Sequence, residues 1–287
     1  MDIGIIMFVT HKSIDIITLA QKAEALGFES LWIPEHPIIP VHMETRFPGS
    51  PDGKLPEFYK QLVDPFVALG AAAAATQKLK IATGICLVPE RNPILLAKEV
   101  ATLDLISKGR FLFGVGAGWL KEETEIMGGD FEHRWRQTKD AVLAMKALWT
   151  QDESSYQGSY YKFPPVWCYP KPVQKPHPPV ILGGEAANVF KRVIEWGDGW
   201  LPRGNYISLE KVAEGRRELD RLAMAAGRDP KSISITVYRA DPNPDSNARY
   251  AEVGVNRVLH LIPSLPEAEA IDALEKLAAT VKPGTAC

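Results

Sequence analysis

A histidine beside a carboxylate is the clearest chemical signal in the chain. Glu35 and His36 directly follow the short apolar run 30–33. Imidazole titrates near neutral pH, so a histidine in a site can donate or accept a proton under physiological conditions. His36 is therefore the first catalytic candidate, with Glu35 as the neighbouring acid. The alternative is that His36 only caps the loop beside Pro37.

A glycine-rich segment spans residues 114–119, Gly-Val-Gly-Ala-Gly-Trp. A dinucleotide-binding fingerprint would need a third glycine where Trp119 stands and a place after the first strand, so that interpretation is rejected. Glycines let a backbone approach a flat ring closely. We therefore expect Gly116, Ala117 and Gly118 in a cofactor site, with Trp119 on the substrate side. A tight exit from a strand is the alternative for Ala117.

Gly183 and Gly184 stand just before a helix that we expect to begin near Ala186. Free backbone N–H groups at a helix N-terminus bind anions, which predicts a phosphate site, although a plain turn would use the same residues.

Three residues at strand ends are candidates for substrate contact: His11, Arg203 and Arg239. For the two arginines, the alternative is a solvated charge on the surface.

Composition excludes several classes of protein. The chain has 33 Lys and Arg against 35 Asp and Glu, a net charge of −2, which leaves no excess charge for nucleic acid or a membrane surface. Cys86, Cys168 and Cys287 are far apart and lack the spacing of a zinc site or a disulfide framework, so we expect no metal and a reducing cytoplasm. Cys86 is expected to pack in the core. The N-terminus shows no signal peptide or membrane-span pattern.

Apolar runs alternate with helical segments along the whole chain. A capping box is expected at Ser264 and Glu267, and an N-cap at Ser13. Eight such units over this length predict an α/β fold, a single (β/α)8 TIM barrel domain over residues 1–287 with insertions. The expected strands are 3–9, 30–33, 79–88, 110–115, 179–182, 199–201, 233–237 and 256–259, and the expected helices are 13–26, 64–76, 92–107, 134–149, 186–196, 209–226 and one after Pro266.

Chemistry in such a barrel lies at the C-terminal ends of the strands, where the loops converge. The long segment 38–62 leaves the second strand directly and must lie at this mouth. The second long segment, 151–178, contains a short hairpin near 156–160 and follows a helix, so its base is expected at the opposite end.

Four segments in order, each near a strand end, carry a resemblance to a known family: 30–36, 83–93, 110–119 and 198–200. They resemble the luciferase-like monooxygenase superfamily, specifically its coenzyme F420-dependent oxidoreductase branch, over nearly the whole chain. The resemblance implies an enzyme that moves hydride between the deazaflavin F420 and a small organic substrate, while His36 handles the accompanying proton. It also implies a homodimer. At Thr83, Gly84 and Ile85 it implies a cofactor contact with a non-prolyl cis peptide, placed at Gly84-Ile85.

The chain departs from the family in one place. The sugar-phosphate dehydrogenases of this branch keep an acidic glutamate near the Trp119 position, so that acid role stays open; Glu122 and Glu123 are nearby but would need to point inward. Residues 131–135 are interpreted as packing at a helix entry. Two other functions remain: an FMN-dependent luciferase-like monooxygenase, and a non-catalytic flavin-binding barrel, supported only by the missing glutamate.

Overall fold

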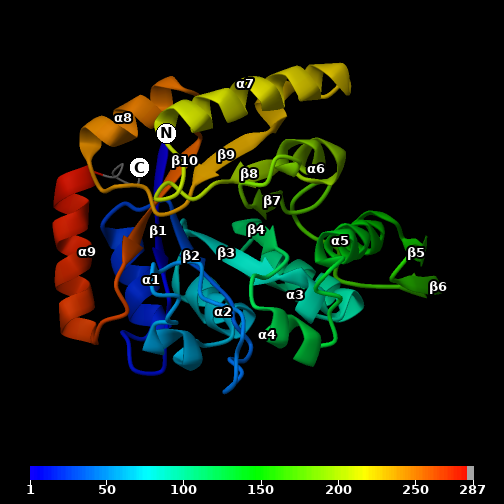
Figure 1. Cartoon of the computed structure of the whole chain (residues 1–287), viewed down its shortest axis with the longest axis horizontal. Helices are drawn as coiled ribbons and strands as arrows, with labels where there is room; N and C mark the ends of the chain where they lie inside the picture. The colour runs from blue at the N-terminus through cyan, green and yellow to red at the C-terminus, as the bar shows by residue number, and fades with distance from the viewer. Residues whose placement is uncertain (283–287) are drawn as a thin grey trace.

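Eight parallel strands close into a barrel in the structure, a computed structural model that describes residues 1–282 (Figure 1). The order around the barrel is β1-β10-β9-β8-β7-β4-β3-β2, which confirms the predicted (β/α)8 architecture. The assignment of the whole chain to one domain stays a prediction. The strands are β1 (Asp2–Met7), β2 (Ser30–Ile33), β3 (Lys80–Leu87), β4 (Phe111–Gly116), β7 (Val180–Gly183), β8 (Gly199–Leu201), β9 (Ser234–Val237) and β10 (Arg257–Ile262).

Helices surround the barrel (Figure 1). Two of them, α4 and α8, were missing from the sequence-based prediction. None of the helices described is long and apolar enough to cross a membrane. The α-helices are α1 (Ile16–Ala25), α2 (Pro65–Ala75), α3 (Pro93–Ile106), α4 (Lys121–Ile126), α5 (Arg134–Thr150), α6 (Val189–Trp196), α7 (Leu209–Ala225), α8 (Pro244–Glu252) and α9 (Glu267–Val281); the 3-10 helices are η1 (Glu57–Gln61), η2 (Val88–Glu90) and η3 (Pro230–Ser232).

The starts of α2 and α3 follow from local sequence. The side chain of Asp64 accepts a hydrogen bond from the Val67 N–H at 2.9 Å, and that of Asn92 accepts one from the Ile94 N–H at 3.0 Å. A proline follows each cap, where a missing N–H costs nothing because the first helical N–H groups have no partner within the helix. Both predicted starts are confirmed.

Two other predicted caps are wrong. Ser13 is held in a turn, where its hydroxyl donates to the Thr10 carbonyl at 3.0 Å, and Asp15 caps α1 instead. The Ser264 hydroxyl donates to the carbonyl of Phe8, so it ties the loop before α9 to the end of β1 rather than capping the helix. In both cases another backbone carbonyl takes the hydroxyl, one within the same turn at Ser13 and one at the end of β1 at Ser264.

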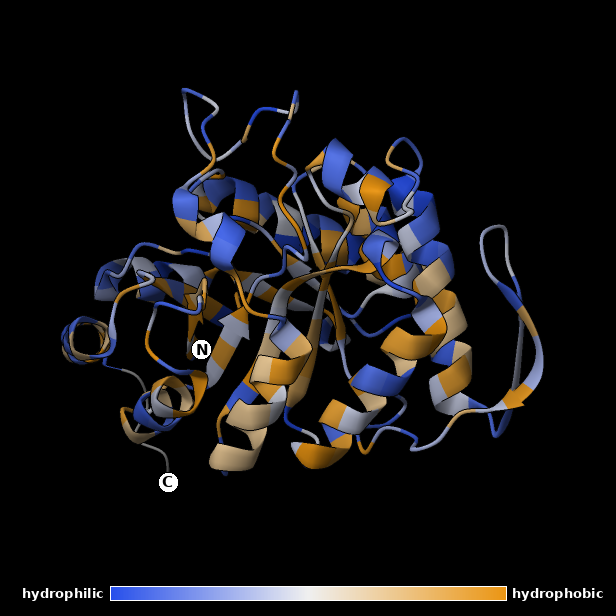
Figure 2. Cartoon of the chain, turned by 90° about the horizontal axis from the view of Figure 1, so that it is seen from below, coloured by the Kyte–Doolittle hydropathy of each residue, from blue (hydrophilic) through white to orange (hydrophobic). Residues whose placement is uncertain are grey.

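The segment 151–178 contains the predicted hairpin, with longer strands than expected: β5 (Glu153–Gln157) and β6 (Lys162–Trp167) pair antiparallel. Its base follows the C-terminal end of α5, away from the active mouth of the barrel, as predicted (Figure 2). The Tyr156 hydroxyl donates to Asp140 of α5 at 2.9 Å. The hairpin therefore returns along the outside of α5.

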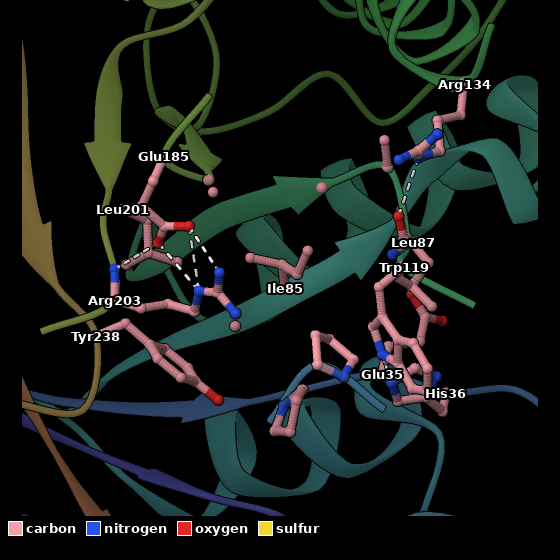
Figure 3. A pocket seen from close by; sticks show the side chains of 18 of the residues that line it. Glu35, His36, Ile85, Leu87, Trp119, Arg134, Glu185, Leu201, Arg203 and Tyr238 are labelled. Atoms are coloured by element: carbon pink, nitrogen blue, oxygen red, sulfur yellow. Dashed lines mark hydrogen bonds and ion pairs between the residues drawn. The ribbon is translucent and has the colours of Figure 1, made fainter. Parts of the chain in front are cut away.

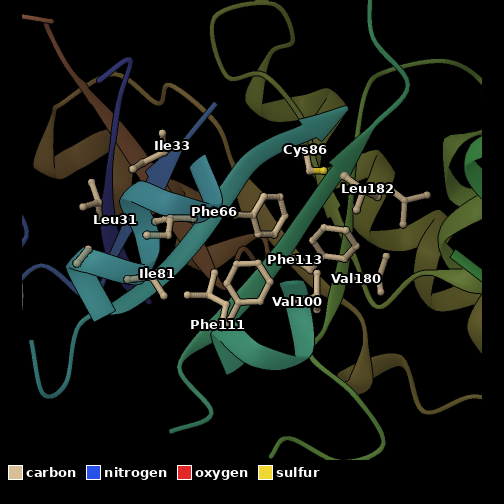
Figure 4. Close-up of a cluster of buried hydrophobic side chains, with 14 of the residues drawn as sticks. Leu31, Ile33, Phe66, Ile81, Cys86, Val100, Phe111, Phe113, Val180 and Leu182 are labelled. Atoms are coloured by element: carbon tan, nitrogen blue, oxygen red, sulfur yellow. The ribbon is translucent and has the colours of Figure 1, made fainter. Parts of the chain in front are cut away.

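Two layers of buried apolar side chains stabilise the barrel. The outer layer fills the space between strands and helices and includes Phe111, Phe113 and Cys86 (Figure 4). Burial raises the pKa of the Cys86 thiol well above its ordinary value, which confirms the predicted packing role. Cys287 lies outside the described residues. The inner layer, inside the barrel, consists of Ile6, Trp32, Ala82, Leu112, Ile181, Leu201 and Leu259.

Candidate functional site

A cavity of about 440 Å³ opens at the C-terminal ends of the barrel strands (Figure 3). Parallel strands all deliver their C-terminal loops to this edge, so residues far apart in the sequence meet there. Pro48 of the segment 38–62 also lines the cavity, which confirms that this segment lies at the mouth. The sequence-predicted residues that line it are Glu35, His36, Gly84, Ile85, Gly116, Ala117, Gly118, Trp119, Gly183, Gly184 and Arg203.

Ile85 forms an apolar support in the middle of the cavity (Figure 3). The pairing of β3 with β4 shifts register within residues 83–86, and the Gly84-Ile85 peptide is cis, as predicted. Gly116 leaves the room that Ile85 needs, because a Cβ on Gly116 would lie 1.7 Å from the Ile85 Cδ1. Together these residues present a surface on which a flat ring can rest.

His36 is held on both sides of its ring. Its Nδ1 lies 2.6 Å from Oε2 of Glu123, and its Nε2 accepts a hydrogen bond from the Trp119 indole N–H at 3.2 Å. The His36 and Glu123 side chains are 6% and 1% exposed. A neutral imidazole with its proton on Nδ1 satisfies both contacts. Glu123, on the first turn of α4, thus points inward and places a carboxylate against the histidine.

The neighbouring Glu122 points the other way. Its Oε1 accepts hydrogen bonds from the backbone N–H groups of Glu44 at 2.6 Å and Thr45 at 2.9 Å. Although burial acts in the opposite direction, these N–H groups lower the pKa of Glu122 to about 2. Glu122 therefore anchors the long loop after β2 to α4.

Glu35 has no free oxygen, and its side chain is only 1% exposed. Its Oε2 accepts from the Leu87 N–H at 2.7 Å, and its Oε1 accepts from Nε of Arg91 at 2.6 Å. Arg91 also contacts Asp64 at 2.8 Å and Glu99 at 3.3 Å. Glu35 thus ties the end of β2 to the residues on either side of η2, and its catalytic role stays a prediction.

A second polar group lies across Ile85 from His36 (Figure 3). Arg203 donates from Nε to Glu185 Oε1 at 3.0 Å and from Nη2 to Oε2 at 2.8 Å, and it stacks 3.8 Å above the Tyr206 ring. Its charge is therefore already balanced. Tyr59 and Tyr238 complete this end, and burial raises the pKa of Tyr59 to about 12. The phenols remain neutral donors at physiological pH.

Two arginines near the cavity have no carboxylate partner among the described residues: Arg134 lines the cavity, and Arg192 stacks on the cavity-lining Trp135. Arg134 donates to the Gly118 carbonyl at 3.1 Å, and Arg192 lies 4.2 Å from the Trp135 ring centre. Within residues 1–282 the buried Nη1 of Arg192 has no hydrogen-bond partner. Burial and the charge of Arg134 lower the pKa of Arg192. Two guanidinium groups close enough for the charge of one to lower the pKa of the other favour a bound anion.

The predicted phosphate site stays a prediction, but the helix start on which it rested is wrong. Gly183 and Gly184 line the cavity, but α6 begins at Val189 rather than near Ala186, so the glycine pair does not stand at a helix N-terminus. Positive charge is available from Arg134, which lines the cavity, and from Arg192, which stacks on Trp135. The interpretation of residues 131–135 as helix packing missed Arg134 and Trp135, which line the cavity because α5 begins at the active mouth.

Three predicted residues are not brought to the cavity lining. His11 is exposed after β1, and the Thr83 hydroxyl donates to the Gly114 carbonyl at 2.7 Å inside the barrel wall. Arg239 lies near Tyr59 and Tyr238 but does not line the cavity. Over the described part of the chain, no group of three His, Cys, Asp or Glu residues could hold a metal ion.

The sequence and the fold of this chain are similar to those of known proteins. The sequence profile of luciferase-like monooxygenases matches residues 4–281. An uncharacterized protein of Mycobacterium tuberculosis is 38% identical over 283 residues, which cover 97% of this chain and 98% of that protein. The FMNH(2)-dependent dimethylsulfone monooxygenase of Pseudomonas putida is 33% identical over 190 residues, 64% of this chain and 51% of that protein. An F420-dependent secondary alcohol dehydrogenase, solved with an F420-acetone adduct, shares the fold with a TM-score of 0.74 at 21% identity over 98% of both chains.

Proposed function

The chain belongs to the luciferase-like monooxygenase family, a family of flavin-dependent oxidoreductases, and from this premise we propose that it is a coenzyme F420-dependent oxidoreductase acting on a small organic substrate. The observation that carries the proposal is the His36 imidazole, held between Glu123 and Trp119 at the edge of a cavity whose centre is Ile85. When bound, the deazaflavin supplies or accepts the hydride.

The residues present fit such a cofactor. Ile85 offers one apolar face, and Gly116 and Gly183 leave space beside it, since a Cβ on Gly183 would also touch Ile85 at 3.4 Å. Arg134 and Arg192 would hold a phosphate, a group that both F420 and FMN carry. The unpartnered Nη1 of Arg192 supports this assignment, because a buried donor without a partner costs free energy that an anion would recover.

His36 would move the proton that accompanies the hydride. Its Nε2 lone pair can take a proton from a substrate hydroxyl, and the protonated ring can return one to a carbonyl oxygen. Glu123 stabilises the imidazolium at Nδ1, while the Trp119 N–H must release Nε2 when that atom is protonated. Tyr59 and Trp119 each contact the His36 ring, and Phe47 contacts both, so aromatic rings cover this side of the histidine.

FMN is the second candidate cofactor, in an FMN-dependent luciferase-like monooxygenase. The 33% identity to an enzyme named for FMNH(2) favours it, but that match covers only 51% of the enzyme. The F420-dependent dehydrogenase matches over 98% of both chains, which supports F420.

Anaerobic titration of the purified protein with F420, and separately with reduced FMN, tests the choice. We expect micromolar binding of F420, with its single violet absorbance band, and hydride exchange with a panel of alcohols and enones. Binding of reduced FMN alone, followed by oxygenation of an organic substrate when oxygen is admitted, would establish the monooxygenase instead. If neither cofactor binds, both proposals fail.

The non-catalytic binding barrel is tested by His36→Ala. Turnover by the wild type that is lost in this variant removes the non-catalytic alternative, whereas binding without turnover across the panel favours it. The expected homodimer and cytoplasmic location stay proposals, and sedimentation velocity tests the first of them.

A further inference from the structure

Glu90, the last residue of η2, is a buried carboxyl group that the proposed reaction does not use. It is 4% exposed, and its Oε1 lies 3.0 Å from the hydroxyl of Thr124. Its Oε2 is buried and has no hydrogen-bond partner among the residues described. A carboxylate oxygen in that position would be costly, whereas the carbonyl oxygen of a neutral carboxyl group costs much less.

The charges around Glu90 also favour its neutral form. Glu123 faces it from α4 and Glu35 from the end of β2, while the charge of Arg91 acts in the opposite direction. Arg91 is already engaged with Glu35 and two further carboxylates. Burial and the charge of Glu123 together raise the pKa of Glu90 to about 8.

The hydrogen bonds around Glu90 also favour its neutral form. The Thr124 hydroxyl lies 3.0 Å from Glu90 Oε1 and 3.1 Å from the Leu120 carbonyl oxygen, and it has one proton to donate. If Glu90 is ionised, both neighbours compete for this proton. If Glu90 is protonated, its O–H donates to Thr124 and Thr124 donates to Leu120, so both contacts of the Thr124 hydroxyl are satisfied and only the neutral carbonyl oxygen Oε2 lacks a partner.

We infer that Glu90 is a positioning residue that holds a proton next to the Glu123–His36 pair and so leaves the negative charge on Glu123, where His36 needs it. The inference rests on the proposed function in one respect: the proposed reaction is the one in which His36 moves a proton. When Glu90 ionises, a second negative charge beside Glu123 favours the imidazolium form of His36 and retains its proton. Proton transfer through His36 is then expected to change above about pH 8.

Infrared difference spectroscopy of the full chain, without cofactor, tests the position of the proton. We expect a protonated-carboxyl C=O band at pH 7 that disappears with a midpoint near pH 8. The band should be absent in Glu90→Gln and unchanged in the matched control Glu122→Gln. In Thr124→Val the band should shift to higher frequency, because the carboxyl group loses its hydrogen-bond acceptor. This shift would assign the band to Glu90 even if Glu90→Gln fails to fold.

Two results overturn the inference. One is the absence of any such band at pH 7, which means that Glu90 is ionised. The other is a band that survives Glu90→Gln and is lost in Glu123→Gln, which places the proton on Glu123. Because these measurements use no cofactor, a failure of the proposed F420 chemistry leaves their outcome unaffected.

The link to His36 is tested by nuclear magnetic resonance of its labelled imidazole. In the wild type, the ring shifts should show an inflection near pH 8 that is missing in Glu90→Gln. An identical titration curve in both proteins would show that Glu90 does not act on His36 and would overturn the inference.

Discussion

The Nδ1 of His36 and the Oε2 of Glu123 lie 2.6 Å apart, although 87 residues separate them in the chain. One residue follows β2 and the other stands on the first turn of α4, so the barrel alone brings them together. The histidine therefore has a buried carboxylate partner, Glu123, although the residue that touches its other ring nitrogen is Trp119.

Glu123→Gln removes the negative charge that stabilises imidazolium and keeps the shape of the side chain. We expect kcat to fall by roughly 100-fold, the scale of general acid–base catalysis, while the cofactor Kd changes less than about threefold. Steady-state kinetics and fluorescence titration measure the two quantities. Glu122→Gln, one residue away but outside the cavity lining, is the matched control. An unchanged kcat in Glu123→Gln would remove this pair from the mechanism.

Arg91→Gln leaves the Glu35 carboxylate buried without its charge partner. We expect the free energy of unfolding to fall by about 3–5 kcal/mol, measured by urea denaturation. Glu99→Gln is the control, because the Glu99 contact with Arg91 is 3.3 Å long and its side chain is 28% exposed; a loss below about 1 kcal/mol is expected there. Equal losses in the two variants would contradict the anchoring role of Glu35.

Gly116→Ala tests the support formed by Ile85. The new Cβ would lie 1.7 Å from the Ile85 Cδ1, so the flexible end of this side chain must turn away into the cavity. The barrel should still fold, but the cofactor Kd should rise at least about 10-fold. Gly70→Ala in α2 is the control, since nothing lies within 4 Å of its Cβ; it should stabilise the protein by up to about 1 kcal/mol.

Arg134→Gln and Arg192→Gln test the anion site. Each should raise the cofactor Kd roughly 10-fold, and inorganic phosphate should compete with the cofactor in the wild type more strongly than in either variant. Arg136→Gln, an exposed arginine on the same helix as Arg134, should bind like the wild type. Normal affinity in both test variants would place the phosphate elsewhere.

Glu90→Gln should change how stability depends on pH. The pKa of Glu90 is raised in the folded chain from 4.5 to about 8, so its contribution is fully present below about pH 4.5 and is lost as pH rises through 8. The variant should match the wild type near pH 4.5 and exceed it at pH 9 by roughly 3–5 kcal/mol. Urea denaturation at both pH values measures this difference. A constant difference between the two proteins would contradict the raised pKa.

Local signals in the sequence predicted the scaffold well. Asp64 and Asn92 cap their helices because a cap needs only a side chain that reaches an N–H group two or three residues ahead, followed by a proline. The same local reasoning failed at Ser13, where a nearby turn engages the hydroxyl and Asp15 takes its place. It also missed α8, which separates the last two strands of the barrel.

What the sequence by itself determined is the barrel and the mouth at which His36 and the glycines meet, whereas the cis peptide at Gly84-Ile85 was implied only by the family resemblance. Only the tertiary structure decided that Glu123 points inward while Glu122 points outward, and that Arg134 lines the cavity while Arg192 stacks on Trp135 beside it. The reason is physical. Strand and cap patterns depend on neighbours in the chain, whereas the direction of a side chain on a short helix depends on how that helix packs against the barrel.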